Sequence, residues 1–220
     1  MKKFAVVLAG SGVYDGAEIH EATLAMLAID QAGASYQCFA PDIPQHHVIN
    51  HLTGEEMPES RNVLIEAARI ARGNIKDLAE FKADDYDVLL FPGGFGAAKN
   101  LSTVAFDGPN ATVNPEVEAA VKAMHSQKKP IAAMCISPVF VAKILQDVTV
   151  TIGSDQDTID TIEAIGATHS LTDHGDVVFD EEHLVFTTPC YMLQAQISDI
   201  WDGASNIVDS IMEFLAENEN

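Results

Sequence analysis

Short apolar runs alternate with amphipathic segments along the chain, and this alternation limits the fold more than any other feature. Three of the runs, 4–9, 86–91 and 131–134, are apolar at nearly every position, which is typical of parallel strands covered by helices on both faces. The sequence therefore predicts an α/β fold: a doubly wound, mostly parallel sheet with helices on both faces. Ligands are expected at the carboxyl ends of the strands.

The remaining elements are predicted from strand patterns and from helix start and stop signals. Further strands are expected at 35–40 and 148–152 and near Val177 and Val185, and helices over 15–32, 59–72, 115–126, 155–165 and 193–216, besides one that follows Cys135. The 47% hydrophobic content suffices for a packed core. Since no internal repeat or linker divides the chain, we expect one domain over residues 1–220.

Acidic residues dominate the charge, because 33 Asp and Glu face only 12 Lys and Arg, a formal net charge of −21. Such a surface repels nucleic acid and anionic membranes, so we expect no function at either. A solvated acidic surface that promotes solubility accounts for the charge. No apolar run reaches about 20 residues, and Met1-Lys2-Lys3 leads into a strand instead of a cleavable signal. We therefore expect a cytoplasmic protein.

A strand-to-helix joint at Cys135 is the strongest candidate for a reactive site. Ala133 and Ser137 are small residues two positions before and after it, as a sharp turn bearing a nucleophile requires. The N-terminus of the following helix would direct free N–H groups at the sulfur and favour the thiolate. The alternative is a small buried core residue, as most free cysteines are. Cys38 and Cys190 lie far from it in sequence without a CxxC pair, so neither a disulfide framework nor a zinc site is indicated.

Two carboxylates near the start of the first helix have different predicted roles. Asp15 and Glu18 have the spacing of an N-cap residue and the third residue of a capping box, which gives Glu18 a structural role. Glu21 shares a helical stripe with Leu24 and Ala25, so it should lean towards the core at the carboxyl end of the first strand. A carboxylate there would have a raised pKa and could act as a general acid or base. The alternative is a surface glutamate.

Two loops complete the candidate features. Pro92-Gly93-Gly94-Phe95-Gly96 follows a buried strand, and consecutive glycines there let backbone N–H groups approach a ligand, as in an oxyanion hole, unless they form only a tight turn. The long loop over 41–58 contains His46, His47 and His51. Adjacent histidines cannot readily chelate one ion, and no carboxylate or cysteine stands at ligand spacing, so we expect no metal.

The conjunction of Glu21 in the first helix, the Pro92–Gly96 loop and the Ala133-x-Cys135 elbow resembles the ThiJ/PfpI superfamily, which has the class I glutamine amidotransferase-like fold. Longer segments resemble the ElbB group of this superfamily, named for enhancing lycopene biosynthesis. These segments are Gly12–Glu21, Asn50–Gly54, Arg61–Arg69 and Phe95–Leu101.

The resemblance implies a weak, cofactor-independent glyoxalase that converts glyoxal into glycolate and is linked to isoprenoid biosynthesis. It assigns Cys135 as the nucleophile, Glu21 as the acid, and the backbone N–H groups of Gly94 and Ile136 as the oxyanion hole. We expect a hemithioacetal on Cys135, with Glu21 moving a proton between the two carbons. The ligand would be a small dicarbonyl, and we expect the chain to form a homodimer.

Two positions depart from relatives in the superfamily. The PfpI proteases have a histidine directly after the cysteine, where Ile136 stands here, and the deglycase branch has one where this chain has Gly153-Ser154-Asp155. His169 is the best remaining candidate for a base. Two alternatives to the glyoxalase stay open: a redox or stress-response protein in which Cys135 is oxidised to sulfinate, and a non-catalytic partner that uses the amidotransferase fold for protein contact.

Overall fold

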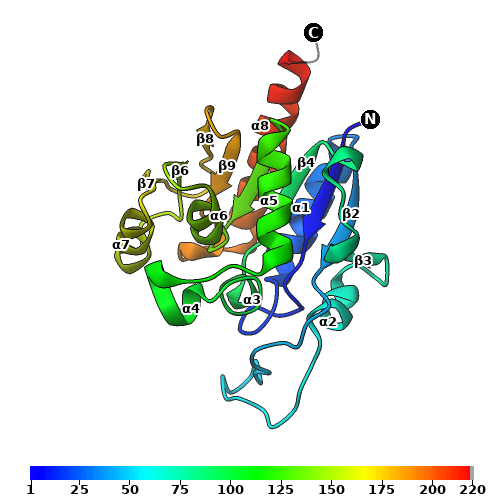
Figure 1. Cartoon of the computed structure of the whole chain (residues 1–220), viewed down its shortest axis with the longest axis vertical. Helices are drawn as coiled ribbons and strands as arrows, with labels where there is room; N and C mark the ends of the chain where they lie inside the picture. The colour runs from blue at the N-terminus through cyan, green and yellow to red at the C-terminus, as the bar shows by residue number, and fades with distance from the viewer. Residues whose placement is uncertain (219–220) are drawn as a thin grey trace.

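The computed structural model describes residues 1–218 (Figure 1). In this part of the chain a seven-stranded sheet has the order β3-β2-β1-β4-β5-β9-β8. Every neighbouring pair is parallel except β8 and β9, which are antiparallel. The strands are β1 (Lys3–Val7), β2 (Ser35–Ala40), β3 (Ile75–Asp77), β4 (Val88–Phe91), β5 (Ile131–Met134), β8 (Val178–Asp180) and β9 (Val185–Thr188). The prediction of a mostly parallel α/β sheet is confirmed.

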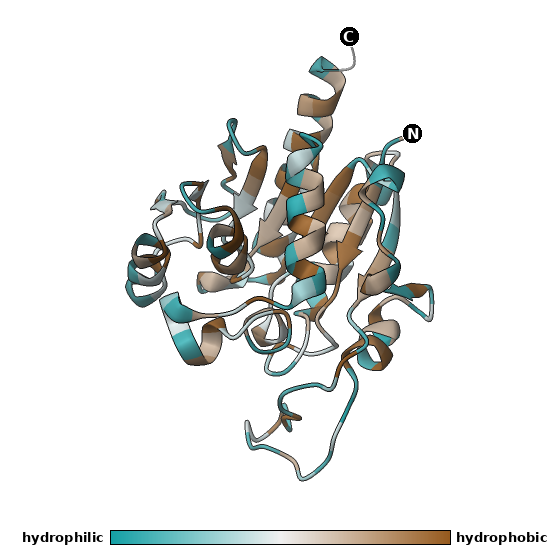
Figure 2. Cartoon of the chain, viewed as in Figure 1, coloured by the Kyte–Doolittle hydropathy of each residue, from teal (hydrophilic) through white to brown (hydrophobic). Residues whose placement is uncertain are grey.

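Helices cover both faces of this sheet. On one face α1 (Ile19–Gln31) packs against the long α8 (Ile197–Glu217), and on the other α5 (Pro115–Ser126) packs against α6 (Pro138–Leu145) and over β4 and β5 (Figure 1). The strands form a band of apolar residues between these layers (Figure 2), and all residues of β4 and β5 are buried. This burial on both faces explains why these strands read as continuous apolar runs.

The shorter elements lie at the margins of the sheet. Helix α2 (Val63–Ile70) follows β2 and packs on β2 and β3. A separate parallel pair, β6 (Thr149–Val150) and β7 (Thr168–His169), is joined through α7 (Gln156–Ile165). Two short helices, α3 (Phe95–Lys99) and α4 (Val104–Asp107), follow β4. The 3-10 segments are η1 (Leu78–Glu80), η2 (Ala83–Asp85), η3 (Gly108–Asn110) and η4 (Cys190–Met192).

The predicted start of the first helix is wrong. The helix begins at Ile19, and its N-cap is Glu18, whose side chain accepts a hydrogen bond from the backbone N–H of Glu21. Asp15 does not cap it, because the preceding residues fold into a loop closed by a hydrogen bond from Gly12 N–H to the Ala17 carbonyl. The buried Asp15 carboxylate instead accepts the backbone N–H of Ile49, 2.7 Å away. The predicted end near Ala32 is confirmed.

Other boundaries also differ from the predictions. Helix α2 begins at Val63 with Asn62 as its cap, not at residue 59, and α8 begins at Ile197, where Gln196 and Asp199 form a capping box. The strand predicted over 148–152 is only the two residues of β6. The short strands β3 and β7 were not predicted, because they offer too few residues for an alternating pattern.

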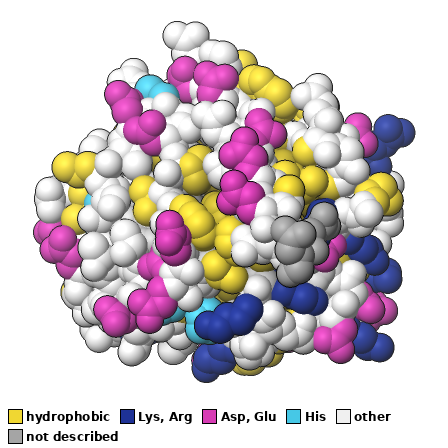
Figure 3. Space-filling model, turned by 90° about the horizontal axis from the view of Figure 1, so that it is seen from above, with side chains coloured by type: hydrophobic (Ala, Val, Ile, Leu, Met, Phe, Trp, Pro, Cys, Tyr) yellow, Lys and Arg dark blue, Asp and Glu magenta, His cyan; other side chains and the backbone are white. Residues whose placement is uncertain are grey.

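The chain leaves the compact body at the loop between β2 and α2, which was predicted as a long loop (Figure 1). Backbone hydrogen bonds order its tip, among them Gly54 N–H to the Asn50 carbonyl and Met57 N–H to the Val48 carbonyl. On the face viewed from above, acidic side chains are spread widely, while Lys and Arg gather along one side (Figure 3). No helix within residues 1–218 is long and apolar enough to cross a membrane.

Candidate active site

Cys135 occupies a strained turn between β5 and α6. Its φ of 59° lies in the left-handed region that L-residues other than Gly, Asn and Asp rarely adopt. Two hydrogen bonds hold the turn in place: Cys135 N–H donates to the Thr188 carbonyl over 3.0 Å, and the buried Ser137 hydroxyl donates to the Pro92 carbonyl over 2.7 Å. The elbow therefore connects the ends of β5, β9 and the loop after β4.

Glu21 lies against this elbow and is 0% exposed, with its side chain buried at the start of α1. Its Oε2 accepts the Gly93 N–H over 2.8 Å, and its Oε1 accepts the Tyr191 N–H over 3.2 Å. The Cys135 thiol is near enough to the same carboxyl group to affect its pKa. Burial, reinforced by the neighbouring Glu18 carboxylate, raises the pKa of Glu21 to about 7. The carboxyl group is thus present in both protonation states near neutral pH.

The two backbone N–H groups expected near the reactive site do face it. Those of Gly94 and Ile136 lie close enough to the Cys135 sulfur to lower the pKa of its thiol. Gly94 has a φ of 96°, which glycine adopts at no steric cost. At Gly93 a methyl group would lie 2.7 Å from Glu21 Oε2 and 2.8 Å from Cys135 Sγ, so only glycine leaves room for the pair. The glycine loop is therefore more than a tight turn.

The expectation that the helix N-terminus favours the Cys135 thiolate is wrong. Burial and the Glu21 carboxylate raise the pKa of this thiol well above its usual value, although the N–H groups of Gly94 and Ile136 act in the opposite direction. Cys135 is 7% exposed, and α6 starts only at Pro138. Burial thus favours the thiol over the thiolate, and the Glu21 carboxylate beside it can act as the acceptor of the thiol proton.

A cavity of about 430 Å³ opens above the sulfur at the carboxyl edge of the sheet. Its walls come from the loop after β1, α3, α4, the first turns of α7, and η4. The lining residues are Val13, Glu18, Gly94, Phe95, Ala98, Val104, Ala105, Cys135, Ile136, Asp155, Asp157, Thr158, Thr161, Tyr191 and Met192. The volume suits a small molecule, and Cys135 is the only cysteine among these residues.

Tyr191 and His20 form a pair at this cavity that the sequence reasoning missed. Tyr191 lines the cavity, its N–H donates to Glu21, and its hydroxyl oxygen lies 2.8 Å from His20 Nδ1. For His20, the only sequence signal is its position directly before Glu21. His169, the base suggested by elimination, instead accepts the Ile152 N–H at Nε2 and does not line the cavity.

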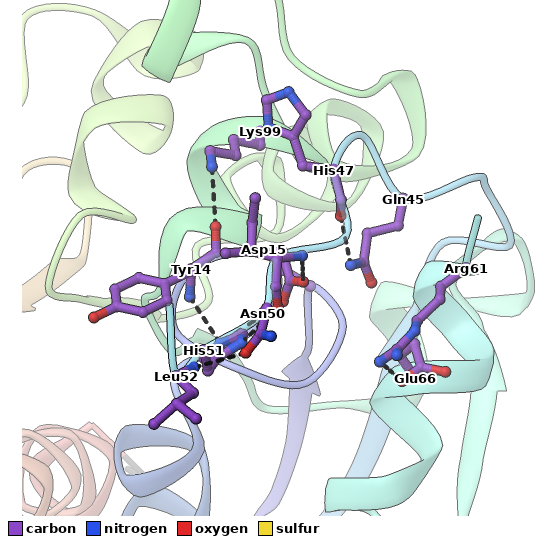
Figure 4. Close-up of polar contacts among 12 residues, drawn as sticks. Tyr14, Asp15, Gln45, His47, Asn50, His51, Leu52, Arg61, Glu66 and Lys99 are labelled. Atoms are coloured by element: carbon purple, nitrogen blue, oxygen red, sulfur yellow. Dashed lines mark hydrogen bonds and ion pairs between the residues drawn. The ribbon is translucent and has the colours of Figure 1, made fainter. Parts of the chain in front are cut away.

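The histidines of the loop after β2 have structural contacts. His51 Nε2 accepts the Tyr14 N–H over 3.2 Å and lies 3.9 Å from Asp15 Oδ1, while its Nδ1 is 3.0 Å from the Ile49 carbonyl (Figure 4). His46 and His47 pack against each other and against Phe106. Within residues 1–218 no group of three His, Cys, Asp or Glu side chains is arranged to hold a metal ion.

Comparison with known proteins identifies the family of the chain. A model of the DJ-1/PfpI family matches residues 7–188. The chain belongs to this family. The resemblance drawn from Glu21, the glycine loop and the elbow is thereby confirmed at the level of the family, as is the amidotransferase-like fold.

Two relatives match nearly the whole chain. The human protein named glutamine amidotransferase-like class 1 domain-containing protein 3, mitochondrial, is 46% identical over 221 residues, which cover 96% of this chain and 82% of the relative. The crystal structure of an isoprenoid biosynthesis protein with an amidotransferase-like domain from Ehrlichia chaffeensis has a TM-score of 0.92 and 37% identity, covering 98% of this chain and 100% of that one.

A more distant structure with a similar fold is that of glyoxalase III from Candida albicans. It has a TM-score of 0.61 and 15% identity, with 96% of each chain covered. At this identity the likeness demonstrates a shared fold alone. The two relatives of higher identity described above are not named for glyoxalase activity.

Proposed function

We propose that this protein converts small dicarbonyl compounds into hydroxy acids without a cofactor, with glyoxal giving glycolate. The observation that supports it is the contact of three groups beneath one cavity: the Cys135 thiol, the Glu21 carboxyl group with a pKa near 7, and the paired N–H groups of Gly94 and Ile136. A nucleophile, a proton acceptor matched to neutral pH and donors for an oxyanion are the parts such a reaction needs.

In the first step the Cys135 sulfur adds to one aldehyde carbon of glyoxal. Glu21 accepts the thiol proton, since its carboxylate form is available near pH 7. It then passes this proton to the new alkoxide oxygen, which completes the hemithioacetal and restores the Glu21 carboxylate for the next step. Because Glu21 accepts this proton, the sulfur does not have to exist as a free thiolate in the buried site, where burial disfavours the charged form. The N–H groups of Gly94 and Ile136 stabilise the developing oxyanion.

In the second step Glu21 removes the C–H proton of the hemithioacetal and returns a proton to the neighbouring carbon through an enediolate. The first carbon is oxidised to a thioester and the second is reduced to a hydroxymethyl group, so no external oxidant or reductant is needed. Water then cleaves the thioester, which releases glycolate and restores the Cys135 thiol. The overall balance is glyoxal plus one water to glycolate and a proton.

A redox function is the second candidate, and the same contacts favour it. A sulfinate on Cys135 would accept hydrogen bonds from Gly94 and Ile136 and one from protonated Glu21. The two functions differ in turnover, because oxidation of Cys135 consumes the site whereas the glyoxalase reaction regenerates it. The name of the Ehrlichia chaffeensis relative refers to isoprenoid biosynthesis, and that of the human relative to the mitochondrion. For this chain we propose a role near isoprenoid biosynthesis and a location in the cytoplasm.

The direct test is a turnover assay with glyoxal, in which glycolate is quantified in the presence of a chelator and without glutathione. The proposal predicts many equivalents of glycolate per protein and none from Cys135→Ser. A metal-independent redox protein would give no more than one equivalent. Sensitivity to the chelator would contradict the cofactor-independent reaction and would revive the histidines of the loop after β2 as ligands.

A further inference from the structure

We propose that the Cys135 cavity selects carbonyl compounds without negative charge, accepting neutral and ammonium-bearing aldehydes and rejecting carboxylated or phosphorylated ones. This inference rests on the proposed function, because it concerns the ligand of the same site. Its basis is the charge of the cavity wall and the direction in which a bound aldehyde must extend.

The cavity wall is negatively charged. Three carboxylates line it, Glu18, Asp155 and Asp157, and no Lys, Arg or His is among its lining residues. None of the three forms an ion pair with a cation elsewhere in residues 1–218. Their hydrogen-bond donors are neutral: Glu18 accepts the Glu21 N–H, and Asp155 accepts the N–H and the hydroxyl of Thr158. The negative charge is therefore not neutralised within the wall.

The reacting end of a substrate is fixed at the floor of the cavity, where Cys135 and the N–H groups of Gly94 and Ile136 meet. Everything beyond the reacting carbonyl must extend towards the opening. The cavity wall there includes the buried Glu18 and, from the first turn of α7, the exposed Asp155 and Asp157. An anionic group in the cavity meets like charges, whereas an ammonium group is attracted.

The remaining wall limits size and polarity. Val13, Phe95, Ala98, Val104 and Met192 give it a mainly apolar surface, which accepts the short hydrocarbon part of a small aldehyde. The N-terminus of α7 would by itself attract an anion, but its cap Asp155 and its first-turn Asp157 already supply negative charge at that end. The lining residues therefore offer no positive group at the opening that could bind a phosphate.

The experiment uses two methanethiosulfonate reagents that transfer groups of opposite charge, trimethylammonioethyl and sulfonatoethyl, and a third that transfers a small neutral methyl group. Modification rates at Cys135 are followed by mass mapping and divided by the rates with 2-mercaptoethanol under the same conditions. The fraction of Cys135 present as thiolate cancels in the ratio, since each reagent meets the same thiol. We expect the cationic reagent to react at least about tenfold faster than the anionic one at low salt.

A matched pair of variants locates the effect. The double change Asp155→Asn and Asp157→Asn should lower the ratio at least about threefold, and asparagine still caps α7. The control, Asp160→Asn with Glu163→Gln, changes the net charge equally on the same helix at exposed positions that do not line the cavity. It should leave the ratio unchanged. In about 1 M salt, where the screening length is about 3 Å, the ratio should fall towards one.

Three results would overturn the inference: a ratio near one or below, an equal loss of the ratio in the control variant, or no modification of Cys135 by any reagent. The rates do not depend on turnover, so this test is separate from that of the proposed function. A protein that converts glyoxal but lacks the charge preference refutes the selectivity alone. A protein with the preference but without glycolate formation refutes the glyoxalase proposal alone.

Discussion

The backbone N–H of Gly93 donates a 2.8 Å hydrogen bond to Oε2 of Glu21, although 72 positions separate the two residues in the chain. This bond joins the start of α1 to the loop after β4 and fixes the carboxyl group beside Cys135. The carboxyl group is held by backbone groups on both oxygens, so its position does not depend on other side chains. Glu21 is therefore a fixed acid–base group beside the nucleophile Cys135.

Replacement of Glu21 by Gln should lower the turnover of glyoxal by about two to four orders of magnitude, the usual share of a general acid or base. Gln cannot accept the proton from Cys135 or from the hemithioacetal. The comparison is with Glu18→Gln, because the amide oxygen of Gln can still accept the Glu21 N–H that Glu18 binds over 2.7 Å. Similar kcat losses in the two variants would show that Glu21 has no special role.

Burial of Glu21 should also make stability depend on pH. Its pKa rises from 4.5 to about 7 on folding, so between these values the folded protein binds more protons than the unfolded chain. The stabilisation is complete below about pH 4.5 and is lost as the pH rises through 7. Urea unfolding at pH 5 and pH 8 should show the wild type losing about 2 kcal/mol relative to Glu21→Gln. Parallel profiles for the two proteins would contradict the raised pKa.

The Tyr191 hydroxyl should contribute to substrate binding, because Tyr191 lines the cavity and His20 Nδ1 lies 2.8 Å from the hydroxyl oxygen. Tyr191→Phe removes this hydroxyl and keeps the backbone N–H bound to Glu21. Loss of one hydrogen bond should lower kcat/KM about five- to tenfold, mainly through KM. Tyr36→Phe, which changes a tyrosine on β2 away from the cavity, serves as the control. An unchanged kcat/KM for Tyr191→Phe would exclude the contact.

Features set by local pattern were predicted from the sequence, whereas those set by distant contacts were not. The strands β4 and β5 and the end of α1 follow from apolar runs and a stop signal within the segment itself. The start of α1 does not, because Asp15 has the side chain of a cap but is recruited by Ile49 from another loop. A capping pattern cannot show which of several backbone donors an aspartate will meet.

The same distinction holds at the site. The elbow and the helical stripe placed Cys135 and Glu21 at one edge of the sheet, and the structure brings them into contact. The protonation of Cys135 was misjudged, because the helix dipole was considered without the burial that opposes it. Tyr191 reaches the cavity from η4, a single short turn with no periodic pattern, so no sequence signal marked it.

The central claim is that Glu21 carries a proton between the two carbons of a hemithioacetal on Cys135. Glyoxal conversion in heavy water, with a chelator present and glutathione absent, tests it most directly. A carboxylic acid at the floor of a cavity open to solvent exchanges the abstracted proton, so glycolate should carry deuterium bound to its methylene carbon. Glycolate whose methylene group contains no deuterium would show that hydrogen moved directly between the carbons, and it would contradict proton transfer by Glu21.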